Sequence, residues 1–386
     1  MKILVAPNAL KGSVSAMEAA ERISLGLKRS GLKAVVDLMP IADGGDDTME
    51  VLVAAGGEVR EIEVLDPLGR PILSQFGLLG DGRTAIVEMA RASGLKLLKS
   101  PERNPLMTTT YGTGQLIAAA IKAGARNVII GIGGSATNDG GVGCALALGL
   151  RIEDGSGRPV PGQGAALRRV RRIDTSGMMP ELSEVTVLVA CDVDNPLLGP
   201  RGASTVFGPQ KGASSADVQE LEANLAHFYA LVSDTLAIDV RERPGAGAAG
   251  GLGAGLMAFL NGQPKSGIDL VLEYLDLPRR LAGVDLVITA EGSMDLQTLS
   301  GKGPIGIAKR ALEYGVPTIA LVGSLGEGEE QLYEAGLKDI LPIVAGPMSL
   351  EEAMARGGEL LEATAARTGR LLSLAPSVSA MAKPDR

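Results

Sequence analysis

The stretch Asn127–Leu150 constrains the fold of this chain most strongly. The apolar run 128–132 is rich in β-branched residues and predicts a buried strand. A loop of glycines and small polar residues follows at Gly133–Gly141, and an apolar helix is expected from Val142. A strand, a glycine-rich loop and a helix in this order predict an anion site. Glycines let backbone N–H groups approach a phosphate, and the helix N-terminus adds unpaired donors.

The side chains of this loop add hydroxyl, amide and carboxylate groups, which suit a sugar acid or a metal-bound phosphate. The residues that carry them are Ser135, Thr137, Asn138 and Asp139. A tight turn that needs glycine for positive φ is the alternative interpretation. Several more glycine-rich loops follow along the chain, and this recurrence favours binding.

A dinucleotide fingerprint also fits this stretch, as Gly131-x-Gly133-x-x-Ala136 with acidic residues about twenty positions further on. A Rossmann crossover needs a connection of about a dozen residues, usually a helix. Only 142–148 is available here before Gly149. This connection is short for a Rossmann crossover, so a nicotinamide-dependent dehydrogenase of a small hydroxy acid is kept only as the alternative function. Protection of the protein against heat by NADH would favour a dehydrogenase, and protection by ATP would favour an ATP-dependent enzyme.

Composition narrows the classes of function. The 386 residues are enough for two or three domains, and 45% apolar with 21% charged residues indicates a globular chain. Aromatic residues are only 2% and the net charge is −8, which argues against a nucleic-acid surface. An acidic protein that binds anionic substrates must use local Lys or Arg side chains, backbone N–H groups or a divalent metal.

Cysteine and histidine are too scarce for most of their usual roles. Cys144 and Cys191 lie in apolar runs and predict buried thiols in a reducing compartment. The only histidine, His227, lies in the helical pattern 218–232, so a structural role is expected. Met1 leads directly into a strand without a signal-peptide core, and no apolar run is long enough to span a bilayer. We expect a cytoplasmic protein with neither membrane nor nucleic-acid partners.

Strands and helices alternate at both ends of the chain. Strands are expected at 3–6, 34–38, 286–289, 318–322 and 340–344, with helices at 13–30, 48–55 and 349–372. This pattern predicts a parallel sheet whose strand-end loops bind ligands. The middle differs, because short strands at 59–64, 72–79 and 84–89 are separated by turn sequences and predict an antiparallel meander.

These patterns predict an α/β protein of two domains. The first is a discontinuous parallel-sheet domain made of 1–57 and 283–372, and an inserted α/β domain occupies 58–282. The small, polar tail 373–386 is expected to be disordered.

Further loops of the inserted segment carry chemical groups. The expected strand 185–190 ends in Asp192-Val-Asp-Asn-Pro196, which suits Mg²⁺ or a substrate hydroxyl. Thr110 lies in a hydroxyl-rich loop before a helix, and Lys211 lies among glycines. The run Gly245-x-Gly-x-x-Gly250 is open to two interpretations, a close-packed helix start or a phosphate cradle.

Phosphoryl transfer is the reaction that this inventory fits. The sequence has no Walker A motif and no protein-kinase H-R-D or D-F-G motif. The reaction needs positioning, cations on the phosphates and a carboxylate near the accepting hydroxyl, and none of these requires histidine.

Eight loops together resemble the type 1 glycerate kinase family. They are Ala6–Gly12, Ala42–Gly45, Thr109–Ile117, Gly131–Gly141, Cys191–Leu197, Phe207–Ala213, Pro244–Leu252 and Gln297–Lys302. The resemblance covers residues 1 to 372. It departs from the family at Asp46-Asp47, where Glu-Gly is usual, and at Ala290, where glycine is usual.

The resemblance implies ATP-dependent phosphorylation of D-glycerate with Mg²⁺, with 2-phosphoglycerate favoured over 3-phosphoglycerate. It also implies a flavodoxin-like (Rossmann-like) domain built from both chain ends, and an active site in the cleft between the two domains. A monomer or a homodimer is expected. A non-catalytic sugar-acid binding protein of the periplasmic type is a third class, disfavoured because no signal peptide is present.

Candidate roles follow from the loops that match. The catalytic candidates are Asp192, Lys11, Asp43 and Lys211. The candidates for binding substrate or phosphate are Asn8, Gly44, Gly45, Thr110, Gly133, Gly134, Ser135, Asn138, Asp139, Gly247, Gln297, Thr298 and Lys302. The metal candidates are Glu291, Asp295 and Asp192. For each single Asp or Lys, a helix cap or a surface charge is the alternative.

Overall fold

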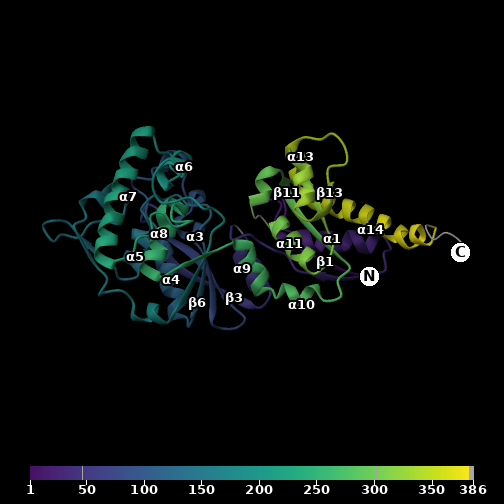
Figure 1. The fold of residues 1–386 in the computed structure, drawn as a ribbon, viewed down its shortest axis with the longest axis horizontal. Coiled ribbons are helices and arrows are strands. Elements are labelled where there is room, and N and C mark those ends of the chain that lie inside the picture. Colours follow the sequence, from purple (N-terminus) through teal and green to yellow (C-terminus); the bar gives the residue numbers. More distant parts are fainter. Residues whose placement is uncertain (46, 301–302, 382–386) are drawn as a thin grey trace. The chain divides into compact units, whose positions relative to one another are not determined.

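The computed structural model describes residues 1–45, 47–300 and 303–381, and the chain forms two compact units (Figure 1). Unit 1 comprises Met1–Asp43 with Ile268–Arg386, and unit 2 comprises Gly44–Gly267. The two chain ends therefore belong to one unit and the middle of the chain to the other. The α/β class and its interrupted first domain are confirmed.

Unit 1 contains a five-stranded parallel sheet in the order β13-β12-β11-β1-β2. The strands are β1 (Lys2–Val5), β2 (Val35–Leu38), β11 (Leu286–Met294), β12 (Thr318–Leu325) and β13 (Leu337–Pro342). Ile3 of β1 pairs with Val36 on one side and with Leu286 on the other. Numbered within the unit, this order is the flavodoxin-like 2-1-3-4-5, so the expected flavodoxin-like domain is confirmed.

Helices cover both faces of this sheet, as its apolar strands require. On β12, Leu321 packs with Ile23 of α1 (Ala16–Arg29) and Leu361 of α14 (Gly357–Met381). The adjacent Val322 packs on the opposite face with Ile305 of α11 (Gly303–Glu313). The other helices of the unit are α9 (Gly267–Tyr274), α10 (Leu277–Leu281), α12 (Glu329–Glu334), α13 (Leu350–Ala355) and the 3-10 turn η6 (Leu296–Ser300).

Helix α14 ends at Met381, so it extends beyond the expected end near Leu372 into the segment expected to be disordered. Residues 382–386 lie outside the described part of the chain.

Unit 2 contains a six-stranded mixed sheet in the order β10-β9-β6-β5-β4-β3. The strands are β3 (Gly57–Leu65), β4 (Pro71–Leu79), β5 (Thr84–Glu88), β6 (Asn127–Gly131), β9 (Thr186–Ala190) and β10 (Gln263–Lys265). The first three pair in antiparallel fashion, which confirms the meander, and the last four are parallel. A separate hairpin pairs β7 (Arg151–Glu153) with β8 (Arg172–Asp174).

The helices of unit 2 surround this sheet and a second apolar cluster beside it. They are α2 (Thr48–Ala54), α3 (Ala90–Ser93), α4 (Tyr111–Lys122), α5 (Val142–Ala147), α6 (Ala203–Phe207), α7 (Ser215–Leu236) and α8 (Ala248–Leu260). Short 3-10 turns lie at η1 (Leu95–Leu97), η2 (Ser100–Glu102), η3 (Gly164–Arg169), η4 (Pro180–Glu184) and η5 (Pro209–Lys211). Within the described ranges, we find no helix with the length and apolarity that crossing a bilayer requires.

The two unit boundaries lie earlier in the chain than the expected Gly57 and Gly283. Helix α2 belongs to unit 2 because it packs on β3, β4 and β5. Helices α9 and α10 belong to unit 1. There Asp269 forms an ion pair with Arg310 at 3.0 Å, and Arg280 forms one with Asp37 at 2.8 Å. Alternation of strands and helices along the chain cannot reveal which sheet a helix covers.

Cys144 and Cys191 are both free thiols. Cys144 is buried as expected, whereas Cys191 is only half-buried. A ring nitrogen of His227, on α7, lies 2.9 Å from the carbonyl oxygen of Val170, which fits the structural role expected for it.

Candidate functional site

In unit 1 the loop after β1 brings two predicted site residues together. Asn8 is only 4% exposed, and its backbone N–H donates to the carbonyl oxygen of Ala290 at 2.9 Å. Its side-chain Oδ1 accepts a hydrogen bond from the backbone of Ala9, and Nδ2 donates to Oδ2 of Asp43 at 3.4 Å. Asn8 therefore joins the end of β1 to the last residue before the chain leaves unit 1.

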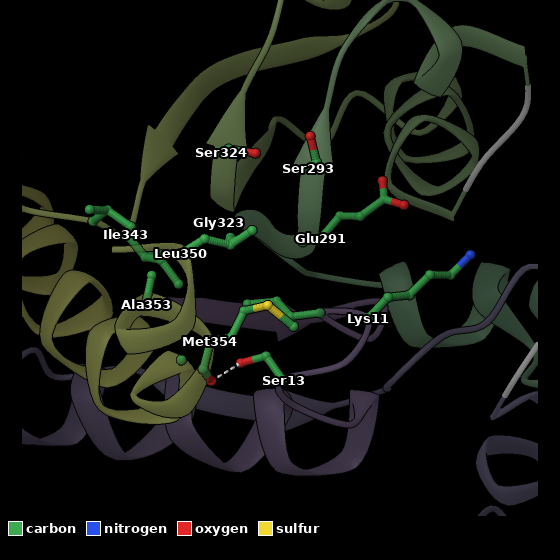
Figure 2. A pocket seen from close by; sticks show the side chains of 14 residues that line it. Lys11, Ser13, Glu291, Ser293, Gly323, Ser324, Ile343, Leu350, Ala353 and Met354 are labelled. Atoms are coloured by element: carbon green, nitrogen blue, oxygen red, sulfur yellow. Dashed lines mark hydrogen bonds between the residues drawn. The ribbon is translucent and has the colours of Figure 1, made fainter. Parts of the chain in front are cut away.

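A pocket of about 330 Å³ opens beside this loop. Lys11 and Glu291 extend toward the same side of the pocket, as Figure 2 shows. Lys11 is exposed, whereas Glu291 is buried near the end of β11. Lys11 is thus a cation at the mouth of a cavity and Glu291 a carboxylate in its wall, which is a pairing able to orient a charged ligand.

The pocket exists because backbone segments approach each other without side chains between them. A Cβ atom on Gly323 of β12 would lie 2.4 Å from the carbonyl oxygen of Gly292 on β11. A Cβ atom on Gly292 would in turn lie 3.3 Å from the backbone nitrogen of Lys11. Glycine at these positions lets β11, β12 and the loop after β1 approach one another closely at this edge of the sheet.

The segment after β11 contributes a local turn. The backbone N–H of Asp295 donates to Oγ1 of Thr298 at 3.1 Å, and the N–H of Thr298 donates to the carbonyl oxygen of Asp295. Thr298 is fully buried, so its hydroxyl serves this turn. Lys302 and the side chain of Gln297 lie outside the described residues.

In unit 2 the predicted residues Gly44 and Gly45 lie across the ends of parallel strands. A Cβ atom on Gly44 would lie 2.8 Å from Cβ of Ala190, the last residue of β9, and 3.2 Å from Cα of Gly267. A Cβ atom on Gly133, just past the end of β6, would lie 3.6 Å from Cα of Gly45. The structure therefore brings together three of the predicted loops, and the two points where the chain enters and leaves unit 2 lie side by side.

Asp192 lies at the same strand edge and is exposed. Its Oδ1 accepts a hydrogen bond from the backbone N–H of Gly267 at 3.0 Å. This bond holds the carboxylate beside the point where the chain leaves unit 2. Asp194 instead forms an ion pair with Arg201 at 2.7 Å. The two carboxylates therefore have different partners. In the described part of the chain, no group of three or more His, Cys, Asp and Glu side chains is arranged to hold a metal.

Asp139 has a different environment from the one expected. It is fully buried, and its carboxylate accepts hydrogen bonds from the backbone N–H groups of Thr110, Gly141 and Gly143. Burial raises the pKa of this carboxyl group and the hydrogen bonds oppose that rise. The N-terminal donors of α5, expected to bind a ligand anion, bind the carboxylate of Asp139, as does the backbone N–H of Thr110 at the start of α4.

Lys211 and Asn138 are also interior residues. Lys211 is 1% exposed, and its Nζ donates to the carbonyl oxygen of Thr137 at 2.7 Å. Burial lowers the pKa of Lys211 to about 7, against the opposing effect of the Asp139 charge. Asn138 donates from Nδ2 to Oγ of Ser204 at 3.1 Å. The loop predicted to bind ligand is thus exposed only at Gly133 and Gly134, and Ser135 and the residues after it are buried.

The glycine run before α8 is a close-packed helix start. Gly250 has a φ of +68°, and a Cβ atom there would lie 1.9 Å from the carbonyl oxygen of Thr137. A Cβ atom on the predicted binding residue Gly247 would lie 2.2 Å from the carbonyl oxygen of Pro196. Protein backbone occupies the space that a phosphate would need, so of the two open interpretations the structure supports packing.

Glu88, which no sequence pattern singled out, ends β5 opposite Gly131 of β6. Glu88 is 5% exposed, and its carboxylate accepts from the backbone N–H of Met49 and from Nε of Arg91. Burial raises the pKa of Glu88. The rule that ligands gather at the ends of parallel strands would have selected it, had β5 been paired in parallel with β6.

Comparison with known proteins adds independent information on this chain. A family model described as the glycerate kinase family matches residues 3–373. The glycerate kinase of Bacillus subtilis (strain 168) is 48% identical over 379 residues, which cover 98% of this chain and 99% of that protein. The glycerate 2-kinase of Escherichia coli (strain K12) is 45% identical over 354 residues, with 92% and 93% covered.

A solved structure is also similar to this chain. The crystal structure assigned to glycerate kinase 2 from Salmonella typhimurium LT2 superposes with a TM-score of 0.89 at 42% sequence identity. It covers 98% of this chain and 99% of that one, so the likeness includes both units.

Proposed function

The chain belongs to the glycerate kinase family, and on that premise we propose that it transfers the γ-phosphoryl group of ATP to the 2-hydroxyl of D-glycerate. The observation that carries this proposal is the match over residues 3–373, together with near-complete coverage of relatives named glycerate kinase. The name of the Escherichia coli relative, glycerate 2-kinase, supports the 2-position.

The structure does not support the nicotinamide alternative. The glycine fingerprint that suggested it, Gly131-x-Gly133-x-x-Ala136, lies in a loop of unit 2 that is buried from Ser135 onward. The other glycine run abuts protein backbone, because a Cβ atom on Gly250 would meet the carbonyl oxygen of Thr137.

The chemistry requires one bond to form and one to break. An oxygen of glycerate bonds to the γ-phosphorus, the bond from that phosphorus to the β,γ-bridging oxygen breaks, and the hydroxyl proton passes to a carboxylate. We assign the carboxylate role to Asp192, with Asp43 as the second candidate. Asp192 is exposed at the end of a parallel strand, and its hydrogen bond to Gly267 holds it in one orientation. Lys11 supplies a positive charge for the phosphates.

Mg²⁺ belongs to this proposal as the metal that accompanies ATP. Magnesium is usually held by one or two carboxylates plus phosphate oxygens and water, so a cluster of three protein ligands is not needed. Glu291 and Asp295 in unit 1 meet that requirement and would hold the ion, and Asp192 would be a ligand only if Asp43 is the base. When bound, Mg²⁺ neutralises charge on the phosphate oxygens.

Phosphorus NMR of the product tests the proposal. Incubation with ATP, D-glycerate and Mg²⁺ is expected to yield the resonance of 2-phosphoglycerate. ATP is expected to persist when glycerate is omitted or when a chelator is in excess. A 3-phosphoglycerate resonance would overturn the position assigned, and turnover that is unchanged in chelator would overturn the metal. The cleft location, the oligomeric state and the cytoplasmic location stay predictions.

A further inference from the structure

The pocket in unit 1 has two chemically different ends. Its apolar end is lined by Ile343, Leu350, Ala353 and Met354, which come from the segment after β13 and from α13 (Figure 2). Lys11 and Glu291 lie at the opposite end, and the hydroxyls of Ser293 and Ser324 lie along one side (Figure 2). A ligand that fills this pocket meets aliphatic side chains at one end, and one cation, one carboxylate and two hydroxyls at the other.

We propose that this pocket binds ATP, with the adenine at the apolar end and the phosphates directed toward Lys11. The inference rests on the proposed function and deepens it, because it assigns the nucleotide to unit 1. D-glycerate bears oxygen on every carbon, so it would leave the apolar end uncovered. A purine presents two apolar faces that aliphatic side chains can cover.

The size of the pocket agrees with this assignment. Its volume of about 330 Å³ lies within the range of small-molecule and cofactor sites. Leu350 is 76% exposed at the edge of the pocket, which is unusual for a side chain beside an apolar cavity, and a bound base would cover it. The pocket is therefore large enough for a nucleoside, and part of its apolar wall is completed by the ligand.

The place of the pocket in the sheet gives an independent argument. In an open α/β sheet, ligands bind beyond the carboxyl ends of the strands where the strand order reverses. In unit 1 the reversal lies between β1 and β11. Lys11 follows β1, and Glu291 and Ser293 lie on β11, so the anionic end of the ligand would lie at this reversal.

The two ends of the pocket are held together by a direct contact. Oγ of Ser13 donates a hydrogen bond to the carbonyl oxygen of Met354 at 2.6 Å (Figure 2). This bond ties the loop that carries Lys11 to the helix that carries the apolar wall. This bond restrains the two segments relative to each other, which lowers the entropy lost when a ligand binds.

Direct binding of ADP to the full-length protein without glycerate tests the proposal. Ala353→Phe fills the apolar end and is expected to weaken ADP binding about tenfold or more, measured by calorimetry, while the KM for D-glycerate is unchanged. Ala355→Phe is the matched control, because Ala355 lies on the same helix and is exposed but does not line the pocket. It is expected to bind ADP as the unsubstituted protein does.

Two further variants test the contacts to the base and to the phosphates separately. Leu350→Ala, at an exposed position where folding is not at risk, is expected to weaken ADP and adenosine alike, by about fivefold. Lys11→Gln is expected to weaken ADP more than adenosine, because adenosine has no phosphate. Unchanged ADP binding in folded Ala353→Phe and Leu350→Ala proteins would overturn the assignment.

The outcomes also separate this inference from the proposed function. If the protein phosphorylates D-glycerate and Ala353→Phe leaves the KM for ATP unchanged, the function stands and the pocket assignment fails. If the protein binds ADP in a way that Ala353→Phe weakens but forms no phosphoglycerate, the assignment stands and the proposed function fails.

Discussion

The carboxylate of Asp139 accepts two hydrogen bonds from Thr110, one from the backbone N–H at 2.7 Å and one from the hydroxyl at 2.8 Å. The same hydroxyl accepts a hydrogen bond from the backbone N–H of Cys144 at 2.9 Å. The pair therefore joins the N-terminus of α4 to that of α5. We infer that Asp139 and Thr110 support the site by positioning these helices.

The first prediction is that Asp139→Asn loses stability. The amide would present an N–H group toward several N–H donors, so at least one buried donor loses its acceptor. The free energy of unfolding is expected to fall by about 3 kcal/mol, measured by urea denaturation. At a temperature where the variant is folded, kcat is expected to stay within a few-fold of the parent. A stable Asp139→Asn protein without activity would contradict this positioning role.

The sequence predicted the sheet of unit 1 well because local patterns determine it. Apolar runs such as Ile3–Ala6 and Leu286–Thr289 lie in strands that pair side by side, and the meander of unit 2 follows from its turn sequences. These patterns involve residues that are close together in the sequence. They can therefore be interpreted without knowing which residues far apart in the chain contact each other.

The candidate site was predicted less well. A glycine in the sequence indicates that another group comes close to the backbone, but it does not show whether that group is protein or ligand. Gly250 contacts the carbonyl oxygen of Thr137, which lies far from it in the sequence. A phosphate would require the same glycine. The pocket residue Met354 gave no signal either, since an apolar residue on a helix predicts only packing.

A second prediction concerns the pH dependence of stability through Lys211. Its folded pKa, about 7, is below the ordinary value of 10.5 because the side chain is buried. Between those two values the unfolded chain binds more protons than the folded chain, so this group makes the free energy of unfolding rise with pH. Below pH 7 its contribution is constant and unfavourable.

Lys211→Met is expected to remove this dependence. The difference in unfolding free energy between parent and variant should change by up to about 1.4 kcal/mol per pH unit between pH 7.5 and 9. Urea titrations at three pH values measure it, and the comparison cancels the titration of the cysteines. Parallel pH profiles for the two proteins would mean that Lys211 is charged in the folded state.

A third prediction compares two glycines with the same backbone conformation. Gly250 and Gly283 have φ of +68° and +69°, but a Cβ atom on Gly283 meets no atom within 4 Å. Gly283→Ala is expected to cost about 1 kcal/mol, from backbone strain alone. Gly250→Ala adds a clash with the oxygen of Thr137 and is expected to cost about 3 kcal/mol or more. Equal melting temperatures of the two variants would refute tight packing at the start of α8.

The last prediction concerns Asp192, whose exposed carboxylate accepts a hydrogen bond from the backbone of Gly267. In Asp192→Asn the amide oxygen can accept the same hydrogen bond, so the melting temperature is expected to change little. A lost general base lowers kcat by about a hundredfold or more, and loss of a metal ligand also lowers the rate. The two roles differ in their dependence on magnesium, because excess Mg²⁺ restores part of the rate only when a ligand was lost.

Asp194→Asn is the matched control for Asp192→Asn. Asp194 is exposed on the same loop, and its ion pair with Arg201 is expected to contribute about 1 kcal/mol or less. This variant should therefore keep nearly normal turnover and a nearly normal melting temperature. Asp192→Asn could instead match Asp194→Asn in kcat while its melting temperature falls. Asp192 would then serve mainly to hold the backbone at Gly267, where the chain leaves unit 2. Asp43 would become the first candidate for the base.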